Sequence, residues 1–306
     1  VIGFSKGDVR TLTQSHQHGF PTPTSWPLTW PGGAASALSA RFGFQGPCLG
    51  PVAACASGVV AVLQAARLIQ TGVCDIVLAG AGDSAVEPLV LAALQQMRVL
   101  ARTEPGSHPA RSVRPFDRLR SGFLPGEGAA LLVLERADHA QSRGQAPLLE
   151  LRGGAFGSDA YHLTDLDPDP AHLAGLIERA LADSGLKPGQ VDLIHPHGTA
   201  TLHNDRLEAL ALKRVFGADL DRTACHASKP QIGHLLGASG AAELVLSCLA
   251  LRDGLVPPTL NRFDPDPELD LPFVSGSAQA RPLQTALKLA IGFGGHLAAV
   301  VVSRVS

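Results

Sequence analysis

The stretch PVAACASGVVAVLQAARLIQTG, residues 51–72, joins a short apolar run to a helix and places Cys55 at the junction. Apolar residues recur at helical spacing after the thiol until Gly72 ends the pattern. A second stretch, ASGAAELVLSCLALRDG at 238–254, aligns without a gap with ASGVVAVLQAARLIQTG at 56–72. Each half of the chain also ends in a glycine-rich turn and an apolar strand. The sequence therefore predicts a duplicated α/β unit.

Composition narrows the class of protein. The chain has 306 residues, 45% of them hydrophobic and 17% charged, and its net charge is −2. This near-neutral balance predicts neither a nucleic-acid nor a membrane partner, and no apolar run has the length of a bilayer-spanning helix. The five cysteines lack CxxC spacing. That pattern favours a reduced, cytoplasmic protein over a disulfide scaffold.

Hydrophobic periodicity predicts strands that alternate with helices, as in a mixed α/β fold with layered sheets. The expected strands cover residues 1–7, 48–54, 74–83, 129–136, 191–198 and 297–305. The expected helices cover residues 34–42, 56–70, 88–100, 171–185 and 239–254. Residues 11–33 and 101–128 are expected to be loops. A polar connector at 136–147 predicts a boundary between a first half, residues 1–140, and a second half, residues 147–306.

Cys55 is the first candidate for chemistry. A thiol at a helix N-terminus faces unpaired N–H groups and the positive end of the helix dipole, so we expect a lowered pKa and a larger thiolate fraction. The small residues that follow it keep the first turn narrow, as a nucleophile for acyl transfer requires. A buried structural role is the alternative, and it is the expected role of the other four cysteines.

The histidine-rich stretch HPHGTATLHND, residues 195–205, supplies the second candidate. His197 follows an apolar strand and opens a Gly-Thr turn, a position at which α/β folds often carry catalytic groups. A histidine held only by loop hydrogen bonds is the alternative. His195, His197 and His203 are close enough in sequence for a metal site. No acidic or thiol ligand completes a convincing set, so we expect no metal.

The stretch SKPQIGHLLGASGAAE, residues 228–243, contains Lys229, His234 and Glu243. Glu243 lies on the helix that repeats the Cys55 helix. If the two halves are related by an approximate twofold axis, these helices meet near the centre and bring His234 close to Cys55. A surface charge for Lys229 and a helix-face ion pair for Glu243 are the plainer alternatives.

The last candidate is the turn GFGGHLAAVVV, residues 292–302. Glycines allow a backbone to approach a ligand closely and to donate its N–H groups to it. The alternative is a tight turn that only closes a sheet.

Taken in this order, these stretches resemble the β-ketoacyl-acyl carrier protein synthases, the condensing enzymes of the thiolase fold. The resemblance runs from about residue 1 to residue 303 and also includes RPFDRLRSGFLPGEGAALLVLE and YHLTDLDPDP. It implies a layered αβαβα fold built from two related halves, and its second histidine is typical of the elongating type. The family pattern begins well before Val1, so we expect the first sheet to lack a central strand and part of its helical cover.

The resemblance also implies roles for single residues. Cys55 would accept the acyl group, while His197 and His234 would promote decarboxylation of a malonyl thioester and stabilise the enolate. Lys229 and Glu243 would be supporting charges. The implied substrate-binding residues are Thr199, Thr201, Asp205, Phe293 and Gly294. The two threonines would contact the pantetheine arm of the carrier, Phe293 would gate the acyl pocket, and the N–H groups of Cys55 and Phe293 would form an oxyanion hole.

The implied reaction is a decarboxylative Claisen condensation in fatty-acid or polyketide-type biosynthesis. It implies an acyl carrier protein as partner, a homodimer or a heterodimer with another ketosynthase-like chain, and no metal or redox cofactor. Two alternatives stay open: a non-catalytic, chain-length-factor-like subunit, and an acyltransferase or thioesterase that does not condense. Near the last turn, His296 directly after GFGG and the apolar lead-in KLAI depart from the family pattern. These departures bear on activity more than on fold.

Overall fold

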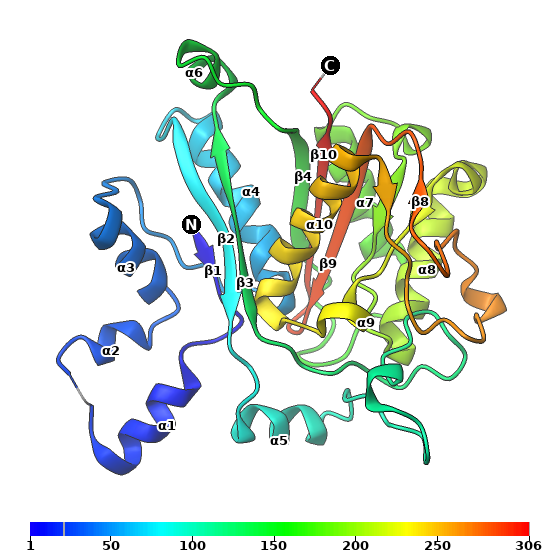
Figure 1. Cartoon of the computed structure of the whole chain (residues 1–306), viewed down its shortest axis with the longest axis horizontal. Helices are drawn as coiled ribbons and strands as arrows, with labels where there is room; N and C mark the ends of the chain where they lie inside the picture. The colour runs from blue at the N-terminus through cyan, green and yellow to red at the C-terminus, as the bar shows by residue number, and fades with distance from the viewer. Residues whose placement is uncertain (21, 306) are drawn as a thin grey trace.

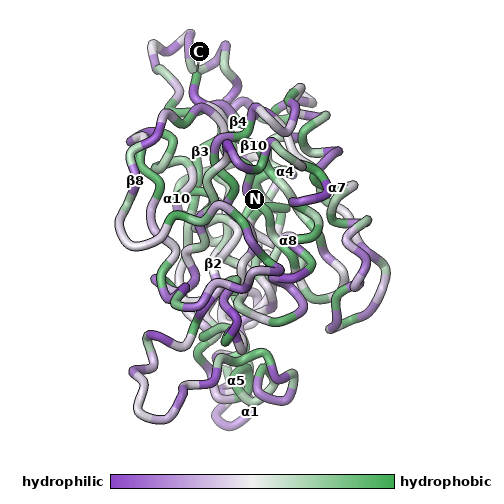
Figure 2. Tube along the Cα trace, turned by 90° about the vertical axis from the view of Figure 1, so that its right-hand side faces the viewer, coloured by the Kyte–Doolittle hydropathy of each residue, from purple (hydrophilic) through white to green (hydrophobic). Residues whose placement is uncertain are grey.

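The computed structural model describes residues 1–20 and 22–305, in which two sheets alternate with layers of helices (Figure 1). None of the described helices combines the length and the hydropathy that a membrane crossing needs. The tube in Figure 2 is mostly hydrophobic along the central elements and mostly hydrophilic in the outer loops. Burial of apolar surface in the layers between the sheets is therefore the main favourable contribution to folding.

The first half of the chain contributes a three-stranded sheet in the order β1-β2-β3. Its elements are β1 (Ile2–Gly3), α1 (Val9–His18), α2 (Ser25–Leu28), α3 (Gly33–Phe42), η1 (Ala54–Ala56), α4 (Ser57–Gln70), β2 (Ile76–Asp83), α5 (Pro88–Gln96), η2 (Pro109–Arg111), β3 (Gly128–Glu135) and α6 (Ala137–Ser142). β1 runs parallel to β2, and β2 runs antiparallel to β3. β2 is thus paired on both sides, so the expected loss of a central strand is not seen in the described residues.

The second half contributes a five-stranded sheet in the order β4-β10-β9-β5-β6. Its elements are β4 (Glu150–Ser158), α7 (Ala171–Asp183), η3 (Pro188–Gln190), β5 (Leu193–His195), α8 (Leu202–Phe216), η4 (Gly217–Arg222), β6 (Ala224–Cys225), α9 (Lys229–Ile232), η5 (Leu236–Ala238), α10 (Ser239–Asp253), β7 (Leu255–Val256), η6 (Pro267–Leu269), β8 (Gln279–Ala280), β9 (Thr285–Gly292) and β10 (His296–Ser303). β9 and β10 form an antiparallel hairpin, and β5 runs parallel to β9. β7 and β8 form a separate two-stranded ladder.

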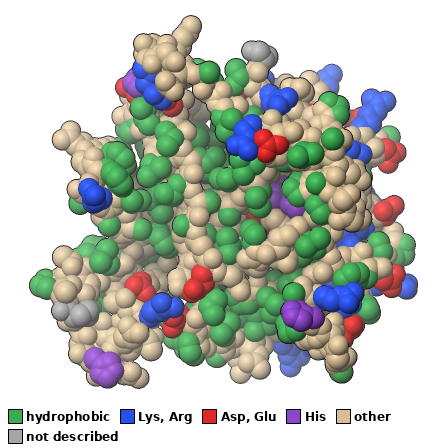
Figure 3. Space-filling model, viewed as in Figure 1, with side chains coloured by type: hydrophobic (Ala, Val, Ile, Leu, Met, Phe, Trp, Pro, Cys, Tyr) green, Lys and Arg blue, Asp and Glu red, His purple; other side chains and the backbone are tan. Residues whose placement is uncertain are grey.

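The two central helices, α4 and α10, lie between the sheets, and α7 and α8 cover the far face of the five-stranded sheet (Figure 1). α4 is apolar nearly all round, as a helix buried on both sides must be. The outer face of the three-stranded sheet is more open: Leu131 and Val133 of β3 are 42% and 65% exposed. Hydrophobic side chains are widely exposed on the face that Figure 3 shows.

The predicted repeat is confirmed in local geometry. η1 followed by α4 and η5 followed by α10 are both a 3-10 turn that continues as an α-helix. The residue that opens each turn has a left-handed backbone, with φ of 46° at Ala54 and 45° at Leu236. Since L-residues rarely adopt this conformation, the same strained turn recurs in both halves.

Several predicted boundaries are wrong. The loop expected at 11–33 contains α1 and α2, because Asp8 caps α1 by accepting a hydrogen bond from the Thr11 N–H at 3.0 Å. The connector at 136–147 contains α6. The helix expected to reach residue 100 ends at Gln96.

The strand expected at 48–54 is extended but forms no regular ladder. The carbonyls of Leu49 and Pro51 accept hydrogen bonds from the N–H groups of Ile2 and Phe4 at 3.0 and 3.3 Å. This segment therefore runs beside β1 much as β6 runs beside β5. α4 of the first half and α10 of the second half pack on each other between the sheets, so the two halves share a core. The division of the chain at 140–147 therefore stays a prediction.

Candidate active site

Cys55 lies in η1, immediately before α4, with its side chain buried between the two halves. The left-handed backbone of Ala54 makes the sharp turn that presents the thiol. The β9–β10 turn approaches this elbow closely. A Cβ on Gly292 would lie 3.0 Å from the Cys55 nitrogen and 3.2 Å from the Ala54 Cβ, so the approach requires glycine.

His197 follows β5, and a buried carboxylate fixes its backbone. Glu208 of α8 accepts hydrogen bonds from the N–H groups of His197 and Gly198 at 2.5 and 2.7 Å. Burial raises the pKa of Glu208 to about 7, although these two backbone donors act in the opposite direction. Glu208 was not among the residues predicted from the sequence, because its place three residues after Asp205 on one helix gave no signal of its own.

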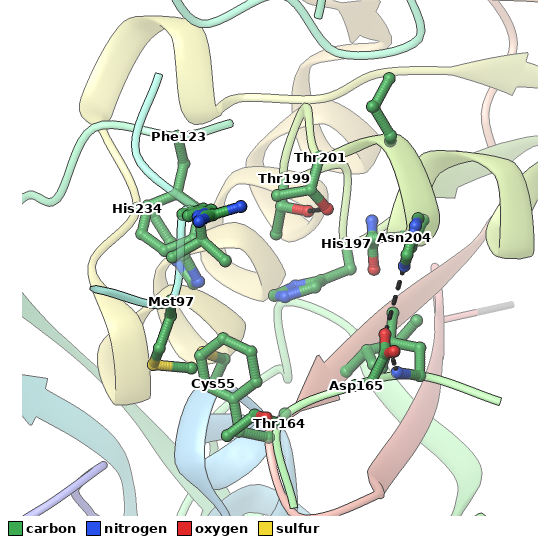
Figure 4. Close-up of a pocket in the computed structure, with 18 of the residues that line it drawn as sticks. Cys55, Met97, Phe123, Thr164, Asp165, His197, Thr199, Thr201, Asn204 and His234 are labelled. Atoms are coloured by element: carbon green, nitrogen blue, oxygen red, sulfur yellow. Dashed lines mark hydrogen bonds and ion pairs between the residues drawn. The ribbon is translucent and has the colours of Figure 1, made fainter. Parts of the chain in front are cut away.

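His234 lies between α9 and η5, and its N–H donates to the Leu124 carbonyl at 2.8 Å. Its ring centroid is 5.3 Å from that of His197, with the planes at 77°. The ligand atoms of Cys55, His197 and His234 all lie within 4.8 Å of one another. Figure 4 shows the three side chains directed at one space. The predicted meeting of the repeated helices therefore does bring His234 to Cys55.

These three residues lie in a pocket of about 590 Å³. Thr199, Thr201 and Phe293, all predicted from the sequence to bind substrate, also line it. The other lining residues include the apolar side chains of Met97, Val99, Phe123 and Ile291 and the polar or charged side chains of Arg98, Arg102, Arg120, His162, Asp165 and His203. The pocket thus combines an apolar wall beside the thiol with a polar rim, as binding sites for amphiphilic ligands commonly do.

Two predicted substrate-binding residues do not line the pocket. Asp205 is buried behind the threonine loop, where its carboxylate accepts hydrogen bonds from the N–H groups of Phe116 and Ala200 at 2.7 and 3.1 Å. Gly294 donates its N–H to the Leu163 carbonyl at 2.8 Å and shapes the turn beyond Phe293. Both residues therefore support the pocket wall. His296 opens β10 and is likewise absent from the lining.

The charged pair behind His197 is buried, as Lys229 and Glu243 are almost fully excluded from solvent. Lys229 Nζ lies 2.7 Å from Glu243 Oε1 and 3.4 Å from His197 Nδ1, and it also contacts the His197 carbonyl oxygen. The surface charge that was the alternative for Lys229 is excluded, and the helix-face ion pair that was the alternative for Glu243 is present but buried. A third charge, Lys288 of β9, lies 2.6 Å from Glu243 Oε2. A lone lysine in the apolar strand TALKLAIG was the available signal for it.

The thiol is less acidic than its position at a helix start predicts. Burial raises the pKa of Cys55 to about 12, and the nearby positive charge of Lys229 offsets this only in part. The expectation of a lowered pKa is therefore wrong, because the second half of the chain covers the thiol. Burial, followed by the charge of Lys229, also holds the pKa of both His197 and His234 well below the usual value. The resting site contains a thiol and two neutral imidazoles.

A hydrogen-bond partner assigns the tautomer of one imidazole. Lys229 has only donors, so Nδ1 of His197 accepts from it and Nε2 carries the proton. The Ser239 hydroxyl lies 2.7 Å from Nδ1 of His234, and a hydroxyl both donates and accepts, so this contact holds the ring in place without fixing its tautomer. His197 therefore has its Nε2–H available for an oxygen atom of a ligand.

The metal alternative fails for the residues that suggested it. The ring of His195 lies 3.0 Å from Ser247 Oγ and 3.2 Å from Ser228 Oγ in the core. His203 is exposed and pairs with Asp165 at 3.2 Å. These rings do not converge with His197. In the part of the chain that the structure describes, the group able to surround a metal ion is Cys55, His197 and His234.

Comparisons with known proteins agree with this site. Residues 1–140 match the family described as "Beta-ketoacyl synthase, N-terminal domain", and residues 148–262 match "Beta-ketoacyl synthase, C-terminal domain". The chain is 38% identical to "3-oxoacyl-[acyl-carrier-protein] synthase 2" of Mycobacterium bovis over 274 residues, which are 90% of this chain and 65% of the relative. It is 40% identical over 273 residues to "Putative polyketide beta-ketoacyl synthase 1" of Streptomyces halstedii, covering 89% of this chain and 64% of that protein.

A solved structure is also similar. It is a type II PKS acyl-carrier protein in complex with its ketosynthase bound to the hexaketide, and the TM-score is 0.95 at 30% identity, over 100% of this chain and 77% of the matched chain. The chain belongs to the beta-ketoacyl synthase family and has its thiolase-like fold. It spans about 65% of the length of the curated relatives it matches.

Proposed function

We propose that the protein catalyses the decarboxylative Claisen condensation of an acyl group on Cys55 with a malonyl group carried by an acyl carrier protein, in fatty-acid or polyketide-type biosynthesis. The observation that carries the proposal is the convergence of one thiol and two neutral imidazoles within 4.8 Å at the pocket of about 590 Å³. The names of the relatives and the solved complex with an acyl-carrier protein support the choice of substrate.

The first step transfers the acyl group. The bond between the acyl carbon and the carrier sulfur breaks, a bond to Cys55 Sγ forms, and the thiol proton ends on the departing carrier thiol. Because the pKa of Cys55 is raised to about 12, the proton must leave as the new bond forms. The N–H groups of Cys55 and Phe293 are proposed to bind the oxyanion.

The second step breaks the bond between the malonyl carboxylate and its α-carbon. Carbon dioxide leaves, and the electron pair forms an enolate whose charge lies on the thioester oxygen. The Nε2–H groups of His197 and His234 are proposed to donate to that oxygen, where a dry site makes such bonds strong. The α-carbon then attacks the acyl carbon on Cys55, the carbon–sulfur bond breaks, and the thiolate takes a proton from solvent.

The remaining parts of the proposal concern partners. Thr199 and Thr201 at the pocket wall suit hydrogen bonds to the amide groups of a phosphopantetheine arm. The protein's own side chains and backbone N–H groups supply each proposed donor and the nucleophile, so the proposed reaction calls for no metal or redox cofactor. We further propose a cytoplasmic enzyme that acts as a homodimer or with a second ketosynthase-like chain.

The experiment that tests the proposal is intact-protein mass spectrometry after incubation with acyl carrier protein bearing a medium-length acyl chain. The wild type should gain one acyl mass and Cys55→Ala none. Malonyl carrier protein is then added, and carbon dioxide release and the β-ketoacyl product are measured for the wild type, His197→Ala and His234→Ala. Each histidine variant should acylate but condense about 100-fold more slowly or worse.

The outcomes separate the alternatives. Acylation without condensation in the wild type would favour an acyltransferase or thioesterase. Absence of acylation unless a second ketosynthase-like chain is added would favour a partner subunit. Absence of both reactions, with any chain length and any partner, would overturn the proposal.

A further inference from the structure

Lys288 is a fully buried lysine in the middle of β9, in an otherwise apolar strand. Its Nζ lies 2.6 Å from Glu243 Oε2, 3.0 Å from the Pro196 carbonyl oxygen and 3.4 Å from the His195 carbonyl oxygen. The ammonium group donates hydrogen bonds to the two carbonyl oxygens, and the carboxylate oxygen lies at ion-pair distance. The side chain is held in one position rather than accommodated in a gap.

The charge of Lys288 is not needed to neutralise Glu243. Lys229 already pairs with the other carboxylate oxygen at 2.7 Å. Among the described residues, Glu243 is the only carboxylate at ion-pair distance from either lysine. Burial of a second ammonium beside a satisfied pair is costly, and an apolar side chain of similar volume would avoid that cost. The arrangement therefore calls for a reason other than stability.

The contacts of Lys288 all fix the surroundings of one catalytic candidate, His197. Pro196 and His195 immediately precede His197 in the chain, so Lys288 fixes the backbone that delivers this imidazole. Through Glu243 it also fixes Lys229, which donates to His197 Nδ1. Its positive charge disfavours a proton on His197 and on His234.

We propose that Lys288 is a positioning residue for the condensation. It clamps the 195–196 backbone and Glu243 so that Lys229 stays against His197. The inference rests on the proposed function for its catalytic part. The effect on the position and tautomer of His197 does not depend on the substrate.

The surroundings of Lys288 also predict a pH dependence. The charged or titratable groups that face it are Glu243 on α10, Lys229 on α9, His195 on β5, His226 after β6 and Glu208 on α8. Burial lowers the pKa of Lys288 to about 8, although Glu243 raises it. The ammonium is therefore lost as the pH rises through about 8. The wild-type kcat is expected to fall over the same range.

The test compares the wild type with Lys288→Met, Lys288→Gln and the exposed control Lys187→Met. Nitrogen-15 spectra of labelled histidines report tautomer and charge, and His197→Ala and His234→Ala spectra assign the signals. In Lys288→Met, the His197 signals should change from a single Nε2–H tautomer to a mixture, because Lys229 is no longer held against Nδ1. Lys187→Met should match the wild type.

Kinetics on carrier-bound substrates provide the second readout. Lys288→Met and Lys288→Gln should lower kcat roughly tenfold or more with little change in KM, because the lysine does not line the pocket. Their rates should lack the fall near pH 8. Unchanged histidine spectra and unchanged kcat in folded Lys288 variants would overturn the inference.

Two further outcomes are decisive. If the wild type shows the histidine effects but does not condense, the proposed function fails and the positioning role stands. If the Lys288 variants do not fold, the wild-type spectra still decide. A single Nε2–H tautomer of His197 supports the inference, and a mixture of tautomers overturns it.

Discussion

Gly58 of α4 and Gly240 of α10 occupy equivalent positions of the two repeated helices, and each lies against the other helix. A Cβ on Gly58 would lie 3.0 Å from the Ala241 Cβ, and a Cβ on Gly240 would lie 2.9 Å from Val59 Cγ2. The two glycines thus let the central helices cross in near contact. The crossing brings η1, with Cys55, next to the start of α10, where Glu243 pairs with the Lys229 that contacts His197.

The first prediction follows from this crossing. Gly58→Ala should lower the free energy of unfolding by about 1–3 kcal/mol, because the added methyl overpacks the interface. Gly175→Ala is the matched control, since Gly175 is also helical but its Cβ would meet only an Arg179 nitrogen at 3.6 Å. It should raise the stability by up to about 1 kcal/mol. Urea denaturation measures both, and equal midpoints for the two variants would show that the helices tolerate a wider spacing.

The second prediction concerns the thiol. With a pKa raised to about 12, Cys55 should react slowly with iodoacetamide at pH 7, and its rate should rise about tenfold per pH unit up to pH 9. The exposed Cys48 should be modified first. Peptide mass spectrometry separates the two sites, and Cys55→Ala identifies the signal. A rate that levels off by pH 8 would mean that the helix start outweighs burial after all.

The sequence predicted the repeat, and with it the approach of His234 to Cys55, because the repeat is a local property. A stretch such as ASGVVAVLQAARLIQTG determines its own turn and helix, and the second copy forms the same turn and helix. The contact between the two helices then follows from the approximate twofold relation of the two copies. α1 was missed because Val9 and Leu12 are its apolar residues, too few to show a helical pattern in a polar stretch, so the Asp8 cap is the clearest mark of its start.

The features that could not be predicted depend on distant parts of the chain. The high pKa of Cys55 arises from burial by the second half, which a local helix-terminus argument does not include. The burial of Lys288 depends on Glu243, which lies on another element. Asp205 matched a family pattern, but which side of the threonine loop it faces is decided by the N–H groups of Phe116 and Ala200.

The third prediction concerns divalent zinc. A thiol and two imidazoles within 4.8 Å suit Zn²⁺, which prefers sulfur and nitrogen ligands and displaces the thiol proton. Micromolar Zn²⁺ should therefore protect Cys55 from alkylation, more strongly at higher pH, and excess chelator should reverse the effect. His234→Ala removes one ligand and should weaken the protection, while Cys48 should be unaffected. Equal protection in the wild type and His234→Ala would place the ion elsewhere.

The fourth prediction is a loss of stability in acid. Burial lowers the pKa of His226 to about 4 and holds the pKa of His195, His197 and His234 well below the usual value. Below about pH 6.5 these four imidazoles bind protons in the unfolded chain but stay neutral in the folded state. Each of them therefore lowers the free energy of unfolding by about 1.4 kcal/mol for each unit by which the pH falls.

Two buried carboxyls act in the opposite direction over the same range. Burial raises the pKa of Asp205 to about 6 and that of Glu208 to about 7, so the folded state binds these two protons before the unfolded state does. Between pH 6 and 4.5 the two carboxyls offset about half of the loss of stability that the four histidines cause. The free energy of unfolding should thus fall by about 3 kcal/mol per pH unit in that window. Urea titrations at a series of pH values measure the slope. His226→Gln should reduce this slope by about 1.4 kcal/mol per pH unit. A slope near zero would mean that the histidines are solvated.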